Sequence, residues 1–150
     1  MTTPNQHAEP ATPRCDGPVA SSDVEFGNLE ANERFLEGSG VLRPGRRVLE
    51  IGAGRGSMVQ WLRAKGLDVQ GLEIDAGLIR EARKRHPAIP LVRATGTALP
   101  YASATFDLVV SFDVFEHIAD SDRHLAEVAR VLKPSGSYLL QTPNKWTNTV

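Results

Sequence analysis

The chain has 150 residues, which is long enough for one domain with a buried core. Hydrophobic residues make up 41% and charged residues 23%, as in an ordinary globular protein, and a net charge of −1 gives no overall field that would attract nucleic acid or an acidic membrane. No apolar run predicts a membrane span or a secretion signal. The single cysteine, Cys15, excludes an internal disulfide and favours a reducing, cytoplasmic location.

The chain divides at its N-terminal end into a polar tail and a domain. Residues 1–22 contain four prolines and almost no large apolar side chains, so we predict a disordered tail. The domain is expected to occupy residues 23–150. Its first element is a helix over Asn28–Glu37, which ends at Gly38 and Gly40.

Beyond Arg46, short apolar runs alternate with segments of helical periodicity. Predicted strands occupy residues 48–51, 69–74, 89–94, 106–111 and 137–142, and predicted helices occupy 57–65, 76–85 and the segment from the capping residue Ser121 to Pro134. The last helix is expected to bury Leu125, Val128, Ala129 and Leu132, which are spaced i, i+3, i+4 and i+7. Strands joined by helices predict an α/β fold: an open, mainly parallel, Rossmann-like sheet with helices on both faces.

A glycine-rich turn follows the first strand. Gly52, Gly54 and Gly56 alternate with other residues, which permits a tight turn and leaves bare backbone for a ligand. In open parallel sheets, ligands bind beyond the carboxyl ends of the strands, and the following helix points its free N–H groups at them. A plain strand–helix turn is the alternative for this loop taken by itself.

An acidic residue, Glu73, ends the second strand. It follows Gly52 by 21 residues and can accept hydrogen bonds from both ribose hydroxyls of an adenosine. The dinucleotide fingerprint requires glycine at position 57, where this chain has Ser57. The two features therefore predict an adenosine-containing cofactor and argue against a nicotinamide or flavin dinucleotide.

Five motifs in register resemble those of class I S-adenosylmethionine-dependent methyltransferases, specifically the small-molecule type. They are Val48–Gly56, Val69–Asp75, Leu99–Val109, Phe112–His117 and Leu132–Ser137. The resemblance runs from about Val41 to Asn144 and implies that the chain uses S-adenosylmethionine. The family sheet has seven strands, so the resemblance also implies that this chain stops after the fifth.

The resemblance further implies a set of cofactor contacts. The glycine turn would lie under the methionine and ribose, Glu50 would help to orient the methionine ammonium, and Glu73 would hold the ribose. The remaining implied contacts are Gly52, Ala53, Gly54, Gly56, Ile74, Ser111 and Phe112.

One position departs from the family pattern. The residue after the third strand is commonly an aspartate that accepts from the adenine amino group, whereas this chain has Thr95. A threonine hydroxyl can accept a hydrogen bond but carries no charge. We therefore expect the adenine contact to involve both Thr95 and the backbone of Gly96.

No catalytic residue is evident, which suits methyl transfer by in-line displacement to a small-molecule acceptor. His117 is a candidate general base, since imidazole titrates near neutral pH, although a histidine that caps or packs a short helix is the favoured interpretation. The spacing of Asp113, His117, Asp120 and His124 fits no standard zinc pattern, so we expect no metal. A basic cluster at residues 80–86 is interpreted as a solvated helix face rather than an RNA contact.

Two functions remain open from the sequence. The first is a methyltransferase, and the second is a truncated or non-catalytic module that binds S-adenosylmethionine or S-adenosylhomocysteine. If strand five ends the sheet, its apolar edge at Tyr138, Leu139 and Leu140 is expected to favour self-association.

Overall fold

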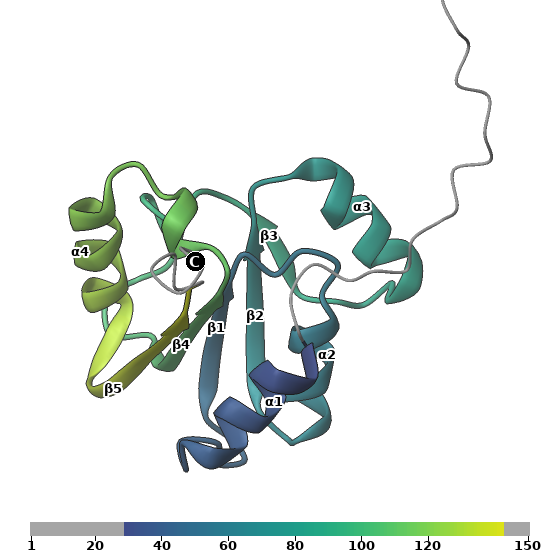
Figure 1. Cartoon of the computed structure of the whole chain (residues 1–150), viewed down its shortest axis with the longest axis horizontal. Coiled ribbons are helices and arrows are strands. Elements are labelled where there is room, and N and C mark those ends of the chain that lie inside the picture. The colour runs from purple at the N-terminus through teal and green to yellow at the C-terminus, as the bar shows by residue number, and fades with distance from the viewer. Residues whose placement is uncertain (1–28, 143–150) are drawn as a thin grey trace, which may run out of the picture.

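A computed structural model describes residues 29–142. Helices and strands alternate through this part of the chain, as Figure 1 shows. In chain order the elements are α1 (Leu29–Gly38), β1 (Arg47–Ile51), α2 (Ser57–Ala64), β2 (Asp68–Glu73), α3 (Ala76–Arg85), β3 (Leu91–Arg93), β4 (Phe106–Phe112), the 3₁₀ turn η1 (Phe115–His117), α4 (Ser121–Val131) and β5 (Leu132–Gln141). The predicted tail at residues 1–22, with Cys15, lies outside the described residues.

The five strands form one parallel sheet in the order β3-β2-β1-β4-β5. From β1 the chain first moves outward through β2 and β3, and it then crosses back to place β4 on the other side of β1. The strand order therefore reverses between β1 and β4, which is where open α/β sheets bind ligands. The predicted Rossmann-like α/β fold is confirmed.

Each face of the sheet buries its own apolar cluster. On one face, Val48 of β1 and Leu108 of β4 pack with Leu36, Val59 and Ala82, which come from α1, α2 and α3. The other face is covered by α4; its cluster contains Leu49, Ile51, Leu72, Leu99, Phe106, Val109, Val128 and Val131. Within residues 29–142, helices thus lie on both faces: α1, α2 and α3 on one and α4 on the other (Figure 1).

The inward face of α4 differs from the predicted one. The helix buries His124, Val128 and Val131, whereas Leu125 is 43% exposed and Ala129 is also exposed. Its N-cap is Asp120, whose carboxylate accepts from the N–H of Arg123 at 3.0 Å, and not Ser121. The apolar spacing was misleading because His124 satisfies both ring nitrogens inside the protein, so a polar residue takes the buried position.

Strand β5 begins earlier than predicted. It starts at Leu132, directly after α4, and runs through Pro134 and Gly136 rather than starting at Ser137. Phe106 pairs with Leu132 and Leu108 pairs with Ser137, so the intervening residues form a bulge instead of ending a helix with a turn. In the described residues β5 lies at an edge of the sheet, which tolerates proline. Self-association through this edge stays a prediction.

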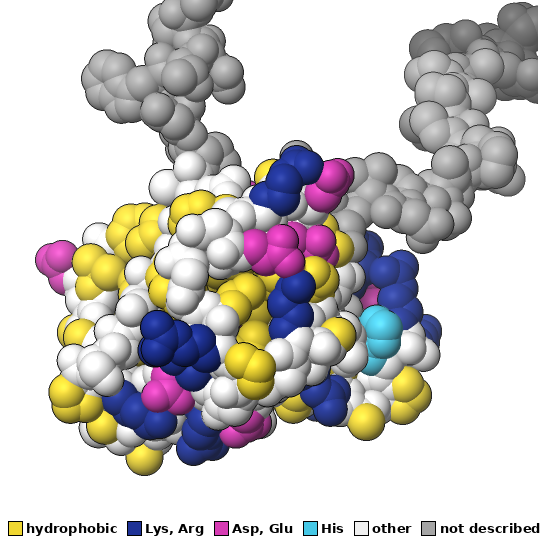
Figure 2. Space-filling model, turned by 90° about the horizontal axis from the view of Figure 1, so that it is seen from below, with side chains coloured by type: hydrophobic (Ala, Val, Ile, Leu, Met, Phe, Trp, Pro, Cys, Tyr) yellow, Lys and Arg dark blue, Asp and Glu magenta, His cyan; other side chains and the backbone are white. Residues whose placement is uncertain are grey.

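The surface carries charges of both signs close together, as the view from below in Figure 2 shows. Several form exposed ion pairs, including Arg47 with Asp68 at 3.1 Å and Lys65 with Glu37 at 2.7 Å. Exposed pairs of this kind contribute little stability. In the described part of the chain, no helix is both long enough and apolar enough to cross a membrane.

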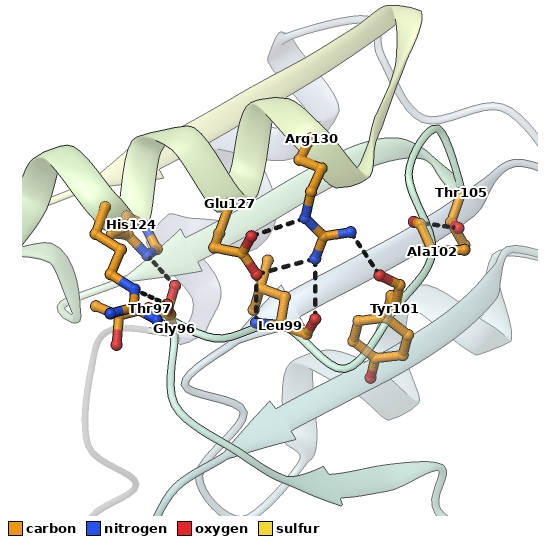
Figure 3. A network of polar contacts seen from close by, with 10 residues as sticks. Gly96, Thr97, Leu99, Tyr101, Ala102, Thr105, His124, Glu127 and Arg130 are labelled. Atoms are coloured by element: carbon orange, nitrogen blue, oxygen red, sulfur yellow. Dashed lines mark hydrogen bonds and ion pairs between the residues drawn. The ribbon is translucent and has the colours of Figure 1, made fainter.

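The segment between β3 and β4 is held by a cluster of polar contacts from α4 (Figure 3). The Arg130 guanidinium binds both carboxylate oxygens of Glu127, at 2.7 and 2.9 Å, and donates to the carbonyls of Leu99 and Tyr101. Glu127 in turn accepts from the N–H of Leu99 at 2.7 Å. Hydrogen bonds from Arg130 and from this N–H lower the pKa of Glu127 to about 2.

Replacing Glu127 with glutamine should therefore destabilise the fold in a pH-dependent way. Because the folded protein holds this carboxylate ionised, its stabilising effect is complete above about pH 4.5 and disappears as the pH falls toward 2. We expect Glu127→Gln to lower the melting temperature by roughly 2–6 °C at pH 7, and the difference from wild type to shrink at acid pH. Thermal unfolding followed by circular dichroism between pH 3 and 7 measures it. Glu30→Gln, which removes an exposed pair with Arg34, is the matched control; a difference that does not change with pH would contradict this account.

Candidate functional site

A cavity of about 680 Å³ lies at the carboxyl ends of β1, β2 and β4, where the strand order reverses. Most residues that the sequence predicts for the cofactor line this cavity: Glu50, Gly52, Ala53, Gly54, Glu73, Ile74, Thr95, Gly96 and Phe112. His117, the candidate base, lines it as well. The structure thus brings together residues from five separate segments of the chain in one pocket.

The glycines of the turn after β1 differ in what surrounds them. All three have positive φ: 79° at Gly52, 51° at Gly54 and 83° at Gly56. A Cβ atom at Gly52 would collide with Val114, and one at Gly56 would collide with Ile89. A Cβ at Gly54, which lines the pocket, would meet nothing within 4 Å, so of the three glycines only this one has open space beside its backbone. Gly52 and Gly56 permit close packing, and Gly54 provides the bare backbone.

Two predicted residues are not among those that line the pocket. Gly56 is buried against Ile89, and Ser111 is 1% exposed with its hydroxyl 2.8 Å from that of Tyr138. Their predicted contacts with the cofactor stay predictions. Ser111 lies directly before Phe112, which does line the pocket.

The Glu73 carboxylate joins the end of β2 to the glycine turn. Oε2 accepts from the N–H of Gly54 at 2.8 Å, and Oε1 accepts from the N–H groups of Ile74 and Asp75 at 2.7 and 2.8 Å. The side chain is 7% exposed, yet it lines the pocket. A carboxylate offers about four lone-pair positions, so these bonds leave room for a further donor from a ligand. The spacing from Gly52 predicted a ligand-binding role for this acid, but it did not indicate that the carboxylate bonds to the N–H of Gly54.

Asp113 is a pocket residue that the sequence analysis did not assign to the ligand. It follows β4 with a φ of 55°, and its N–H donates to the carbonyl of Gln141 at 2.9 Å. Burial raises the pKa of its carboxyl group, and the nearby negative charge of Glu116 raises it further. A left-handed backbone at a non-glycine residue is unusual and occurs often at functional sites. The sequence signal that could have identified Asp113 as a pocket residue was its position directly after Phe112, near the end of a predicted strand.

The first helix also closes the pocket, which the sequence did not indicate. Leu29 and Asn32 of α1 line it, and Asn32 is 5% exposed. The ring of Phe35 packs edge-on against that of Phe112, with centroids 6.5 Å apart. This contact joins residues far apart in the chain, so local periodicity could not reveal it.

His117 lies in η1 with an exposed side chain, and its backbone N–H donates to the carbonyl of Val114. No common metal site is formed by Asp113, His117, Asp120 and His124, because His124 is fully buried in contacts with Gly96 and Tyr138. Within residues 29–142, no group of three or more acidic, histidine or cysteine side chains is placed to hold a metal ion.

Comparison with known proteins gives a consistent result. The family described as methyltransferase domain matches residues 49–140. A Mycolicibacterium smegmatis protein named as a probable S-adenosylmethionine-dependent methyltransferase is 36% identical over 69% of this chain and 40% of its own length. A demethylmenaquinone methyltransferase from Renibacterium salmoninarum is 34% identical over 81% of this chain and 52% of its own.

A solved structure is similar over the same region. It is phosphoethanolamine N-methyltransferase 2 of Haemonchus contortus, in complex with phosphomonomethylethanolamine and S-adenosylhomocysteine. Its TM-score is 0.72 with 26% sequence identity, and the match covers 77% of this chain and 28% of that one. The chain therefore spans about half, or less than half, of the length of these relatives.

Gly54 offers a test of whether the turn receives a ligand. We expect Gly54→Val to abolish binding of S-adenosylhomocysteine, because a branched side chain would fill the open space beside the backbone. Gly40 is the matched control, since it also has a positive φ, 69°, with nothing within 4 Å of a Cβ, but it does not line the pocket. Calorimetry should show binding retained by Gly40→Val and lost by Gly54→Val while both remain folded. Equal affinity in the two variants would mean that the turn is only structural.

Asp113→Asn should stabilise the protein at neutral pH. Since burial raises the pKa of Asp113, the folded state binds its proton more tightly than the unfolded state, and wild-type stability falls as the pH rises through that range. Asparagine carries no charge and tolerates a positive φ. We expect a melting temperature higher by roughly 1–4 °C at pH 7.5, with a smaller gain at pH 4. Asp122→Asn, in the exposed first turn of α4, should give no gain, and a gain there equal to that of Asp113→Asn would overturn the explanation.

Proposed function

Because the chain belongs to the class I S-adenosylmethionine-dependent methyltransferases, we propose that its pocket binds S-adenosylmethionine and that the protein transfers the methyl group to a small molecule. One observation carries this proposal: the Glu73 carboxylate and the open backbone at Gly54 meet in one cavity at the point where the strand order reverses. The chain spans only part of its relatives, so the activity of the whole protein is part of the proposal.

The pocket fits a nucleoside-sized ligand with an amino-acid arm. Its volume, about 680 Å³, lies within the range of small-molecule sites. Glu73 supplies a fixed acceptor for a ribose hydroxyl, and Glu50, which is 5% exposed, supplies a carboxylate for the methionine ammonium. Ile74 is 64% exposed, although it is a large apolar residue, and so offers a surface on which adenine can pack.

The adenine end of the pocket would be formed by Thr95 and Gly96. The Thr95 hydroxyl lies 3.0 Å from that of Thr97 and accepts a long hydrogen bond, 3.3 Å, from its N–H. These local bonds hold a neutral acceptor where the family pattern given above has an aspartate. Phe112 would lie beside the cofactor at the end of β4.

Bound S-adenosylmethionine supplies an electrophilic methyl group on a sulfonium that leaves as a neutral thioether. The residues of this chain then need only bind, orient the acceptor and exclude water. Leu29 and Phe112 give the pocket an apolar wall near α1. His117 and Asp113 are titratable groups in the pocket wall and are candidates to take a proton from an acceptor hydroxyl or amine.

The acceptor is proposed to be a small molecule. The family resemblance favours substrates such as quinone precursors, lipids and secondary metabolites. The relatives named for demethylmenaquinone and phosphoethanolamine methylation fall within that range. We further propose a cytoplasmic location and no nucleic-acid partner. The alternative is a module that binds S-adenosylmethionine or S-adenosylhomocysteine without turnover. The match covers only 52% of the Renibacterium relative, so it does not decide between the two functions.

Calorimetry tests the cofactor. S-adenosylhomocysteine should bind and NAD should not, and Glu73→Ala should weaken binding by roughly 1–3 kcal/mol because a ribose hydroxyl loses its partner in a partly buried site. Glu30→Ala, an exposed acid on α1, should bind as wild type does. Binding of NAD alone, or an unchanged affinity in folded Glu73→Ala, would refute the assignment. A screen of acceptors with methyl-labelled cofactor then separates an enzyme from a binding module.

A further inference from the structure

A buried histidine connects the pocket wall to the two strands at the β5 edge. His124 of α4 is 0% exposed, and its Nδ1 lies 2.8 Å from the carbonyl oxygen of Gly96, a pocket residue (Figure 3). Its Nε2 lies 3.0 Å from the hydroxyl of Tyr138 in β5, and that hydroxyl lies 2.8 Å from the hydroxyl of Ser111 in β4. The imidazole also packs against the rings of Phe115 and Tyr138, each with centroids 5.9 Å away.

The chemistry of these groups sets the direction of the chain of hydrogen bonds. A carbonyl oxygen can only accept, so Nδ1 of His124 must carry the hydrogen. In a neutral imidazole Nε2 is then an acceptor, which takes the hydroxyl hydrogen of Tyr138. The Tyr138 oxygen in turn accepts from Ser111. The bonds therefore run from Ser111 through Tyr138 and His124 to the carbonyl of Gly96.

The loop is shaped for this contact. A Cβ atom at position 96 would lie 3.0 Å from Nδ1 of His124 and 3.4 Å from its Cε1, so glycine permits the close approach. The next carbonyl, that of Thr97, accepts from Nε of Arg123 at 2.9 Å. Helix α4 thus holds two successive carbonyls of the loop that lines the adenine end of the proposed site.

We propose that His124 is a positioning residue for cofactor binding: its Nδ1–H fixes the carbonyl of Gly96 and so orients the Thr95–Thr97 loop in the pocket wall. This role rests on the proposed function, because it concerns the same S-adenosylmethionine site. A mobile Gly96 carbonyl would leave the loop to be ordered when the ligand binds, which costs affinity.

Two substitutions of the same residue separate this role from simple packing. In asparagine the amide nitrogen is bonded to Cγ, as Nδ1 is in histidine, so His124→Asn can keep the donor to Gly96 and loses the bond to Tyr138. In glutamine the amide lies one bond farther along, so His124→Gln can keep the bond to Tyr138 and loses the donor to Gly96. Both variants remove the ring, so its packing is lost in each.

We expect S-adenosylhomocysteine affinity to fall by roughly tenfold in His124→Gln and by less than about threefold in His124→Asn. Tyr138→Phe, which removes the hydroxyl but leaves the bond to Gly96, should also stay within about threefold of wild type. Calorimetry at one pH, on variants whose thermal unfolding shows a folded protein, measures all three. Equal losses in the asparagine and glutamine variants, or no loss in either, would overturn the role.

A spectroscopic measurement tests the hydrogen bond even where a variant fails to fold. ¹⁵N chemical shifts of the wild-type imidazole should report a hydrogen on Nδ1, and a tautomer with hydrogen on Nε2 alone would overturn the proposal. Absence of S-adenosylhomocysteine binding by wild type would overturn the proposed function and this role together. Wild-type binding without a difference between the asparagine and glutamine variants would overturn only the role of His124.

Discussion

The carboxylate of Glu73 accepts hydrogen bonds from three backbone N–H groups, and one of them belongs to Gly54 in the turn after β1. This interaction connects the ends of two neighbouring strands at the centre of the sheet. The same turn is tied to β2 by the N–H groups of Gly52 and Ala53, which both donate to the carbonyl of Leu72. The shape of the pocket at the glycine turn therefore depends on Glu73, and backbone N–H groups of the turn and of the end of β2 in turn fix the position of its carboxylate.

The opposite wall of the pocket depends on α4. The helix reaches the segment between β3 and β4 through Arg123, His124, Glu127 and Arg130, and four of their contacts end on the backbone carbonyls of residues 96, 97, 99 and 101 (Figure 3). Backbone carbonyls that would otherwise be poorly satisfied in a loop are thus hydrogen-bonded to a regular helix. A loop without secondary structure of its own becomes a defined surface for a ligand.

Local patterns accounted for most of the fold and much of the site. The helix over residues 76–85 was predicted, and the structure shows it as α3, capped by the Asp75 carboxylate, which accepts from the N–H groups of Gly77 and Leu78. The face of α4 was wrong because periodicity counts apolar residues, whereas His124 is buried through partners 28 and 14 residues away in the chain. Likewise, Pro134 was expected to end the last helix, but it lies in a bulge of an edge strand, and that bulge depends on pairing with β4.

By itself, the sequence determined the alternation of strands and helices, the glycine turn after β1, the acid at the end of β2 and the family to which these motifs belong. Such features are encoded by spacing within short segments, so they can be read without knowing what lies nearby in space. Only the tertiary structure decided which glycine faces open space, that Leu29 and Asn32 help to close the pocket, that Asp113 adopts a positive φ, and that His124 is buried against Gly96. Each of these depends on contacts between segments distant in the chain, and burial and hydrogen-bond partners are set by those contacts rather than by local order.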